Sequence, residues 1–189
     1  MDHDAPACGE IATTEEEAAL VRAINLDRRN FGALYERYAT SLYRYALHQT
    51  GSPQEAEDLV SSTMLAALEA WNRFDPSRGS LAGWLFGIAR HKLAQHRRLR
   101  RRLERLLRHV VRVSGQASVD NPGPETEDIL ALREALHHLA PNDQEVIVLR
   151  YGAGLSTREI ADALAISEAA VRVRLTRARH RLKRELGGE

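Results

Sequence analysis

The sequence predicts an all-α protein made of two small helical domains joined by a flexible linker. Apolar side chains recur at spacings of three and four residues through most of the chain, which is the period of an amphipathic helix. Helix-capping residues stand in front of these stretches. A segment rich in Pro, Gly and small residues, 114–128, interrupts the pattern and predicts the linker. The 189 residues are 43% hydrophobic, which is ordinary for a chain that folds around a packed core.

Composition argues against several classes of protein. Cys8 is the single cysteine, so we expect no internal disulfide and no multi-cysteine metal site. No apolar run approaches the ~20 residues that span a membrane, and the acidic start of the chain does not resemble a signal peptide. We therefore expect a cytoplasmic protein without cofactor, metal or membrane insertion. Residues 1–29 read as a partly disordered extension, in which His3 and Cys8 are too few to close a zinc site.

Four helices are expected before the linker, the first within the extension and the other three in the first domain. A capping box at Thr13–Glu16 or Thr14–Glu17 starts the first, which runs through Ile24. A helix over about 30–49 has a broad apolar side: Phe31, Leu34, Tyr35, Tyr38, Leu42, Tyr45 and Ala46. After Gly51, Ser52 caps a helix over 53–73 that starts with Pro53. Its inward residues are predicted to be Ala56, Leu59, Val60, Thr63, Ala67 and Leu68, opposite a polar face that needs solvent or a partner.

A loop over 74–80 is predicted from Pro76 and Gly79, and Ser80 caps the helix that follows. This helix starts apolar and then turns into a cluster of arginines: Arg97, Arg98, Arg100, Arg101, Arg102, Arg105, Arg108 and Arg112. We interpret the cluster as a contact to nucleic-acid phosphates. Two alternatives remain open, a solvated amphipathic helix and a helix on an anionic membrane, since Leu99, Leu103, Leu106, Leu107 and Val110 form a narrow apolar stripe.

The last thirty residues predict a helix-turn-helix. Ser156 and Glu159 form a capping box before the first helix, and Ser167 caps the second. In the second helix the buried stripe is expected to be Val171, Leu175, Ala178 and Leu182. The opposite face then carries small residues and arginines: Ala169, Arg172, Val173, Thr176, Arg177 and His180. Small side chains permit close approach to a major groove and arginine can fork onto guanine, although a merely solvated basic face is the alternative.

The order of motifs resembles a bacterial extracytoplasmic-function (ECF) sigma factor of the sigma-70 family. The resemblance rests on the following stretches: Phe31–Leu34–Tyr35, Leu42–Ala46, Ala56–Val60, Phe74–Asp75, Trp84–Arg90, Leu139–Pro141, Val148–Tyr151 and Glu159–Ala161. It implies a sigma2 domain over 30–113 and a sigma4 domain over 129–189, with only the linker 114–128 between them. The first 29 residues lie outside both.

The resemblance also implies a role for individual residues. The polymerase-binding surface, which docks on the β′ clamp helices, is expected to consist of Asp58, Leu59, Ser61, Ser62 and Met64. Those at the −10 promoter element, where a loop opens the duplex and holds an unstacked base, are Phe74, Asp75, Arg78, Arg90 and His91. Those at the −35 element are Arg150, Arg172, Val173, Thr176 and Arg177, of which the last four also face outward by periodicity.

We therefore expect a factor that binds core RNA polymerase through the β′ and β subunits and directs it to promoter DNA, without chemistry of its own. Holding both DNA-binding domains on one polymerase makes two modest contacts selective. The resemblance further implies an anti-sigma partner. Two alternatives are a stand-alone helix-turn-helix regulator and a hydrolase that uses His137 or His138, for which no nucleophile elbow, phosphate loop or metal-spaced cluster is present.

Overall fold

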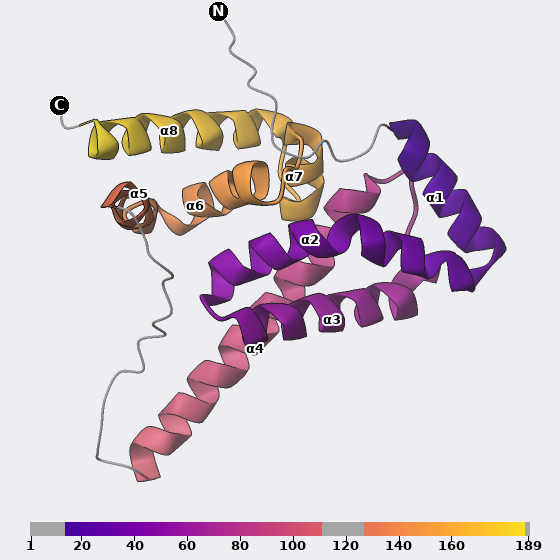
Figure 1. Cartoon of the computed structure of the whole chain (residues 1–189), viewed down its shortest axis with the longest axis horizontal. Coiled ribbons are helices and arrows are strands. Elements are labelled where there is room, and N and C mark those ends of the chain that lie inside the picture. The colour runs from indigo at the N-terminus through magenta and orange to yellow at the C-terminus, as the bar shows by residue number, and fades with distance from the viewer. Residues whose placement is uncertain (1–13, 111–126, 188–189) are drawn as a thin grey trace, which may run out of the picture.

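The structure, a computed structural model, describes residues 14–110 and 127–187, and these residues form helices and connecting turns without a strand (Figure 1). The all-α prediction is confirmed. Residues 1–13 of the predicted extension and 114–126 of the predicted linker lie outside the described residues, whereas 14–26 of the extension form a helix whose Val21 and Ile24 are buried. The helices are α1 (Thr14–Leu26), α2 (Phe31–Thr50), α3 (Pro53–Ala70), α4 (Leu81–Val110), α5 (Glu127–His137), α6 (Pro141–Ile147), α7 (Thr157–Leu164) and α8 (Glu168–Leu186), with short turns at Arg28–Asn30, Trp71–Arg73 and Val148–Gly152.

The N-terminal half, 14–110, packs α1, α2 and α3 against the start of α4. Gly51 ends α2 with a φ of 71°, a left-handed conformation that glycine adopts without strain, and the Glu55 amide donates to Ser52 Oγ over 3.4 Å. Both caps agree with the sequence prediction. Tyr35 and Leu68 were expected to face inward but are 50% and 40% exposed. The packed neighbours cover the middle of each apolar stripe and leave its edge open.

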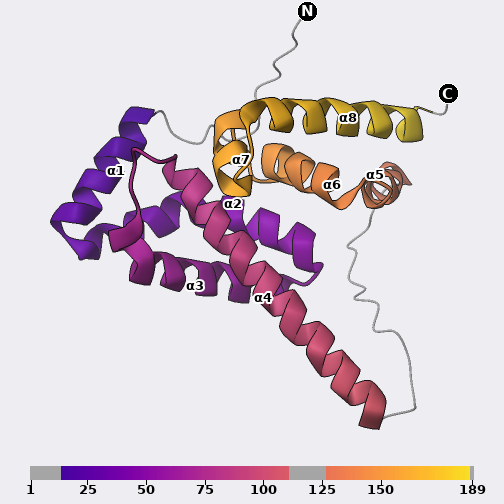
Figure 2. The same cartoon turned by 180° about the vertical axis from the view of Figure 1, so that it is seen from behind.

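Helix α4 is the longest element, with 30 residues and therefore about 45 Å of length. Its first three turns are buried in the core through Leu81, Leu85 and Phe86. Its second part projects away from the body of the molecule (Figures 1 and 2). The prediction that one helix passes from the core into a charged surface is confirmed; the side chains beyond 102 lie outside the described residues.

The C-terminal half, 127–187, contains the predicted helix-turn-helix in α7 and α8. The Glu159 amide donates to Ser156 Oγ over 3.2 Å and the Ser156 amide donates to Glu159 Oε2 over 2.6 Å, which completes the capping box. The helical period after Pro141 predicts that Tyr151 points inward together with Val146, Ile147 and Leu149, but Tyr151 is 59% exposed. The turn Val148–Gly152 is wound as a π-helix, and its extra residue per turn changes the direction in which Tyr151 points.

The two halves pack directly against each other, with α7 on the start of α4 and the turn Val148–Gly152 on α2 (Figures 1 and 2). Buried residues of both halves form one continuous apolar cluster. At Gly83, α4 approaches α7 so closely that a Cβ added to Gly83 would lie 2.4 Å from Asp162 Cβ. Glycine at this position is therefore what lets α4 and α7 touch.

Candidate nucleic-acid and polymerase interfaces

The outward face of α8 is the candidate site for duplex DNA. Val171, Leu175 and Ala178 are buried, and the residues on the other side of the helix are exposed, with Val173 at 62%. The helix lies along the outer edge of the C-terminal half (Figure 1). The predicted orientation of Arg172, Thr176 and Arg177 is therefore the one that the structure has. A duplex can reach this face without any rearrangement of the C-terminal half.

Arg177 is held in a defined position by an acid of α6. Its Nε donates to Asp143 Oδ2 over 2.7 Å and its Nη2 donates to Oδ1 over 2.5 Å, and these bonds raise the pKa of Arg177. Asp143 is buried, whereas the side chain of Arg177 remains 61% exposed. Guanidinium carries five N–H donors, so the pairing orients the group and leaves donors for a base or phosphate. Arg172 has a looser partner in Glu168, at 3.2 Å on the same helix face.

Arg150 differs from the other four residues predicted at the −35 element. It is partly buried, and its Nη1 donates to the carbonyl oxygen of Leu155 over 3.1 Å. This bond braces the segment that leads from the π-helical turn to α7. The structure thus places Arg150 just before the helix-turn-helix, where it holds the entry to α7 in place.

A second candidate site is a cavity of about 270 Å³ under the loop 74–80. Its lining combines three aromatic or basic side chains of the loop region with residues of α4 and α7: Arg73, Phe74, Asp75, Arg78, Gly79, Ser80, Trp84 and Asp162. The rings of Phe74 and Trp84 are 5.1 Å apart, and Trp71 lies 5.6 Å from Phe74 and 5.8 Å from Trp84. An aromatic wall next to arginines suits an unstacked base and its phosphate.

The loop itself is preformed. Asp75 Oδ1 accepts hydrogen bonds from the Ser77 amide over 2.9 Å and from Ser77 Oγ over 2.7 Å, which lower the pKa of Asp75 and keep it ionised. Of the predicted −10 residues, the structure brings Phe74, Asp75 and Arg78 together in this cavity. Sequence reasoning did not single out Trp84 for this site, although it stands one helical turn after the cap Ser80 on α4.

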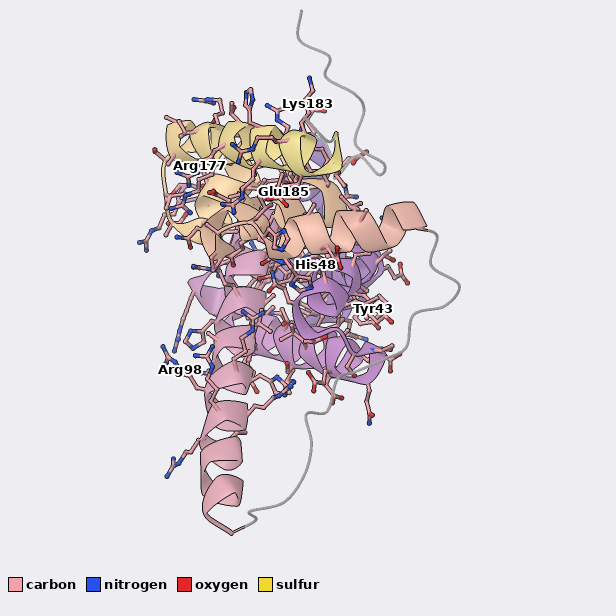
Figure 3. The ribbon with its side chains drawn as sticks, turned by 90° about the vertical axis from the view of Figure 1, so that its left-hand side faces the viewer. Tyr43, His48, Arg98, Arg177, Lys183 and Glu185 are labelled. Carbon is pink, nitrogen blue, oxygen red and sulfur yellow. The ribbon has the colours of Figure 1, made fainter. Side chains whose placement is uncertain are left out.

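Arg90 and His91 lie about 10 Å beyond Trp84 along α4, in a separate basic groove. This groove has a volume of about 530 Å³ and is lined chiefly by Arg90, His91, Arg97, Arg98, Arg101 and Glu145. Gln95 Nε2 is 2.9 Å from His91 Nε2. Arg98 of α4 and Arg177 of α8 both lie on the left side of the molecule in Figure 3.

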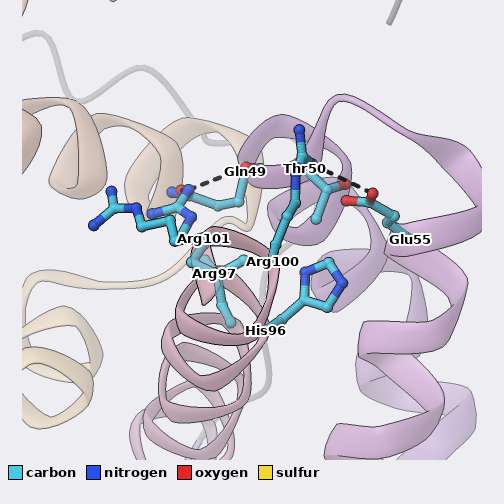
Figure 4. Close-up of a pocket in the computed structure, with 8 residues that line it drawn as sticks. Gln49, Thr50, Glu55, His96, Arg97, Arg100 and Arg101 are labelled. Atoms are coloured by element: carbon cyan, nitrogen blue, oxygen red, sulfur yellow. Dashed lines mark hydrogen bonds and ion pairs between the residues drawn. The ribbon is translucent and has the colours of Figure 1, made fainter. Parts of the chain in front are cut away.

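The arginine cluster is partly tied to the turn between α2 and α3 (Figure 4). Arg97 Nη2 donates to the Gln49 carbonyl over 3.0 Å and to Gln49 Oε1 over 2.7 Å, and Arg100 pairs with Glu55 at 3.4 Å. Leu99, from the stripe weighed as a membrane contact, is 67% exposed. No helix among the described residues is long and apolar enough to cross a membrane.

The predicted polymerase-binding residues fall into two groups on α3. Asp58 and Ser61 are exposed, whereas Leu59 and Met64 are 7% and 6% exposed and belong to the core. Ser62 is intermediate, and its Oγ donates to the Leu59 carbonyl over 3.1 Å. Two apolar residues that the prediction missed, Leu65 at 58% and Leu68 at 40% exposure, continue the line of Asp58 and Ser61 at spacings of four and three.

The histidines weighed as catalytic groups lie on the surface. His138 Nδ1 is 2.8 Å from Glu185 Oε2, and this contact lowers the pKa of Glu185. Both His137 and His138 are exposed. Within 14–110 and 127–187, no group of three or more His, Cys, Asp and Glu side chains is arranged to hold a metal ion.

Comparison with known proteins gives the class to which this architecture belongs. Residues 34–103 match sigma-70 region 2, and residues 129–182 match sigma-70 region 4. The chain is therefore a member of the sigma-70 family, with the two regions separated by a gap. Within that family it belongs to the ECF RNA polymerase sigma factors, which are non-enzymatic transcription initiation factors. The catalytic alternative is thereby set aside.

Individual relatives support the same assignment. The chain is 34% identical to the ECF sigma factor SigL of Mycobacterium tuberculosis over 164 residues, covering 84% of each protein. It is also 34% identical to BldN of Streptomyces coelicolor over 158 residues, which is 82% of this chain and 60% of BldN. The structure of CnrH in complex with the cytosolic domain of CnrY superposes with a TM-score of 0.66 at 27% identity, covering 92% of this chain and 98% of that one.

Proposed function

We propose that the chain carries three separate working surfaces, one for core polymerase and one for each promoter element. The observation that carries the proposal is that a single chain combines an aromatic cavity suited to an unstacked base with an exposed basic helix suited to duplex DNA. A promoter presents both forms of DNA when it opens. The domain boundaries that we propose are 30–113 for sigma2 and 129–189 for sigma4, in a cytoplasmic protein.

The polymerase surface is the exposed line Asp58, Ser61, Leu65 and Leu68 on α3. Leu59 and Met64 lie beneath it in the core and fix its position. An apolar centre of two leucines with a polar rim is typical of a protein interface. This surface docks on the β′ clamp helices, and Ser62 at its edge contributes through its half-buried hydroxyl.

At the −10 element, Phe74 and Trp84 receive the unstacked base and Arg78 holds its phosphate. Arg90, His91 and the arginines of the basic groove track the strand beyond the base. At the −35 element, α8 enters the major groove with Arg172, Val173, Thr176 and Arg177 toward the bases. Arg150 braces the segment that leads into α7.

We also propose an anti-sigma partner. The superposing structure of CnrH is a complex with CnrY, and a second structure of the same fold is RpoE of Bartonella quintana with the anti-sigma factor NepR, at 23% identity and a TM-score of 0.58. The present chain has a large apolar groove between its halves, about 750 Å³, lined by residues that include Leu132, Tyr151 and Leu182. A partner helix on this groove would keep the chain from polymerase.

The stand-alone regulator accounts for α8 but leaves the α3 line and the aromatic cavity without a role. Run-off transcription with core polymerase on a genomic library separates the two hypotheses. We expect defined start sites that depend on the added protein and share a two-part sequence upstream. Duplex binding by the chain alone, with no start-site choice conferred on polymerase, would contradict the proposal.

A further inference from the structure

Trp71, in the turn after α3, packs against both rings of the aromatic cavity. Its side chain is 2% exposed, and its ring lies 5.6 Å from that of Phe74 and 5.8 Å from that of Trp84. The Phe74 amide also donates to the Trp71 carbonyl over 3.0 Å. Because the three rings are in contact, a shift of the Trp71 ring displaces the wall on which we expect a base to stack.

The edge of the Trp71 ring is held by Asn25, a residue of α1. Trp71 Nε1 donates to Asn25 Oδ1 over 2.8 Å, and the two residues are 46 positions apart in sequence. The indole N–H is the one polar group of a tryptophan side chain, and it can only donate. Asn25 therefore satisfies a buried donor that would be costly to leave without an acceptor, and the bond selects one orientation of the ring.

The turn that follows α1 contacts the same ring. Phe31 meets Trp71 edge to face, with centroids 5.8 Å apart and planes at 86°. The guanidinium carbon of Arg28 lies 6.0 Å from the centroid of the Trp71 ring. The turn is tied back to α1, because Asn30 Nδ2 donates to the Ala23 carbonyl over 2.8 Å. One N-terminal segment thus holds Trp71 both at its edge and over its face.

Helix α1 can serve as a support because it is itself fixed to the core. Ile24 is buried, Val21 is 8% exposed, and the Tyr38 hydroxyl of α2 donates to Glu17 Oε1 over 2.6 Å. The helix lies beside the connection between α3 and α4 (Figures 1 and 2). The match to sigma-70 region 2 begins at residue 34, so Asn25 precedes it. A contact that fixes the wall of the cavity therefore comes from outside the matched region.

We propose that Asn25 is a positioning residue of the −10 site, which holds Trp71 so that Phe74 and Trp84 keep the spacing that receives a base. The inference rests on the assignment of the −10 residues made above. Asn25 acts through the Trp71 ring, so its contribution is present only when a base stacks on the wall. Contacts of Arg78 with a phosphate do not depend on it.

The test uses the full chain with core polymerase on promoters in which abasic sites are placed one at a time through the −10 element recovered by run-off transcription. In the wild type, the position at which a missing base weakens open complexes most identifies the captured base. Asn25→Ala should weaken open complexes about fivefold on the intact promoter, the effect of one lost hydrogen bond, and should leave those on the promoter without that base unchanged. Asn25→Asp keeps an acceptor for the indole and should restore the wild-type ratio between the two promoters. An equal loss on both promoters, or no loss, would overturn the inference.

A double-mutant cycle shows whether Asn25 acts through Trp71. Trp71→Phe keeps an aromatic ring and removes the indole donor, so it should lower the same ratio, and adding Asn25→Ala should cause no further loss. A further fivefold loss in the double variant would refute the positioning role. Leu26→Ala is the matched control, because it shortens the neighbouring side chain of α1, which is 88% exposed. It should keep the wild-type ratio.

The contact itself has a spectroscopic signature. The chain has two tryptophans, so its nitrogen-15 spectrum should contain two indole N–H signals. Asn25→Ala should speed the hydrogen exchange of the Trp71 indole and leave that of Trp84 as in the wild type. Unchanged exchange at Trp71 in the folded variant would contradict the bond on which the inference depends. Wild-type open complexes that are insensitive to every abasic site would instead refute the −10 assignment, and the positioning role with it, while the exchange of the Trp71 indole would still report the contact with Asn25.

Discussion

The two DNA-facing sites of this chain are built in different ways. The outward face of α8 is fixed by its own periodicity, its serine cap and the buried stripe behind it, all within about thirty residues of sequence. The aromatic cavity under the loop 74–80 instead needs Phe74 from the loop, Trp84 from α4 and Asp162 from α7, with Trp71 of the turn after α3 packed against both rings. The first site is local, and the second exists only when distant elements pack.

This difference implies that a substitution in the cavity disturbs several elements at once, whereas one on α8 acts at a single position. Phe74→Ala should therefore have the largest effect. It removes a ring that contacts both Trp71 and Trp84, and base stacking on an aromatic side chain is worth as much as ~3 kcal/mol, or about 150-fold. Heparin-resistant open complexes on a cognate promoter should decrease accordingly.

Tyr35→Ala provides the control for Phe74→Ala, because this ring of α2 is 50% exposed and lies outside the cavity. It should form open complexes as the wild type does. If Phe74→Ala also retained normal open complexes while its thermal stability fell, the ring would be a packing residue and the cavity would lose its assigned role.

Arg177 offers the corresponding test of the local site. Arg177→Ala removes a fork that Asp143 orients, and the loss of one bidentate base contact costs about 2 kcal/mol, or roughly 30-fold in discrimination. Competition between −35 sequences in a polymerase-dependent assay measures this discrimination. Arg177→Lys should retain the ion pair with Asp143 but lose discrimination, because ammonium lacks the planar fork. Unchanged preference in both variants would remove Arg177 from the set of reading residues.

The same contrast explains how far the sequence alone could predict the molecule. The helices, the loop 74–80 and the capping box follow from local patterns, and the structure has all of them. Asp162 could not be predicted as a neighbour of the loop, because its proximity arises from the packing of α7 on α4. The contact of Trp84 with Phe74 depends on how the loop folds back on the start of α4. Tyr151 was misplaced for a related reason, since no local pattern announced the π-helical turn. Leu65 was missed because an exposed leucine carries no signal by itself.

A smaller effect, on stability, is expected from changing Ser156, the residue that caps α7 of the helix-turn-helix. Ser156→Ala removes the acceptor for the Glu159 amide at the start of α7, which typically costs ~1 kcal/mol. Denaturant unfolding should show this loss, whereas Ser156→Thr should retain most of the stability. Because the cap acts within one turn, the hydrogen-exchange protection of α7 should fall and that of α3 should not. A simultaneous loss of both would show that the site is less local than we infer.

The smallest predicted effect concerns Glu159, the other residue of the capping box, and the pH dependence of stability. Burial raises the pKa of Glu159 above its ordinary value, although the hydrogen bonds from Ser156 act in the opposite direction. A raised pKa in the folded state means that protonated Glu159 favours folding below the ordinary value of 4.5, and that this contribution is lost as the pH rises through the folded value.

Glu159→Gln keeps an acceptor for the Ser156 amide without the buried charge. Its free energy of unfolding relative to the wild type should therefore improve between about pH 4 and pH 7, by less than ~1 kcal/mol. Urea unfolding at both pH values measures the difference, and a relative stability that instead worsened with rising pH would show that the ionised carboxylate, and not its burial, dominates this cap.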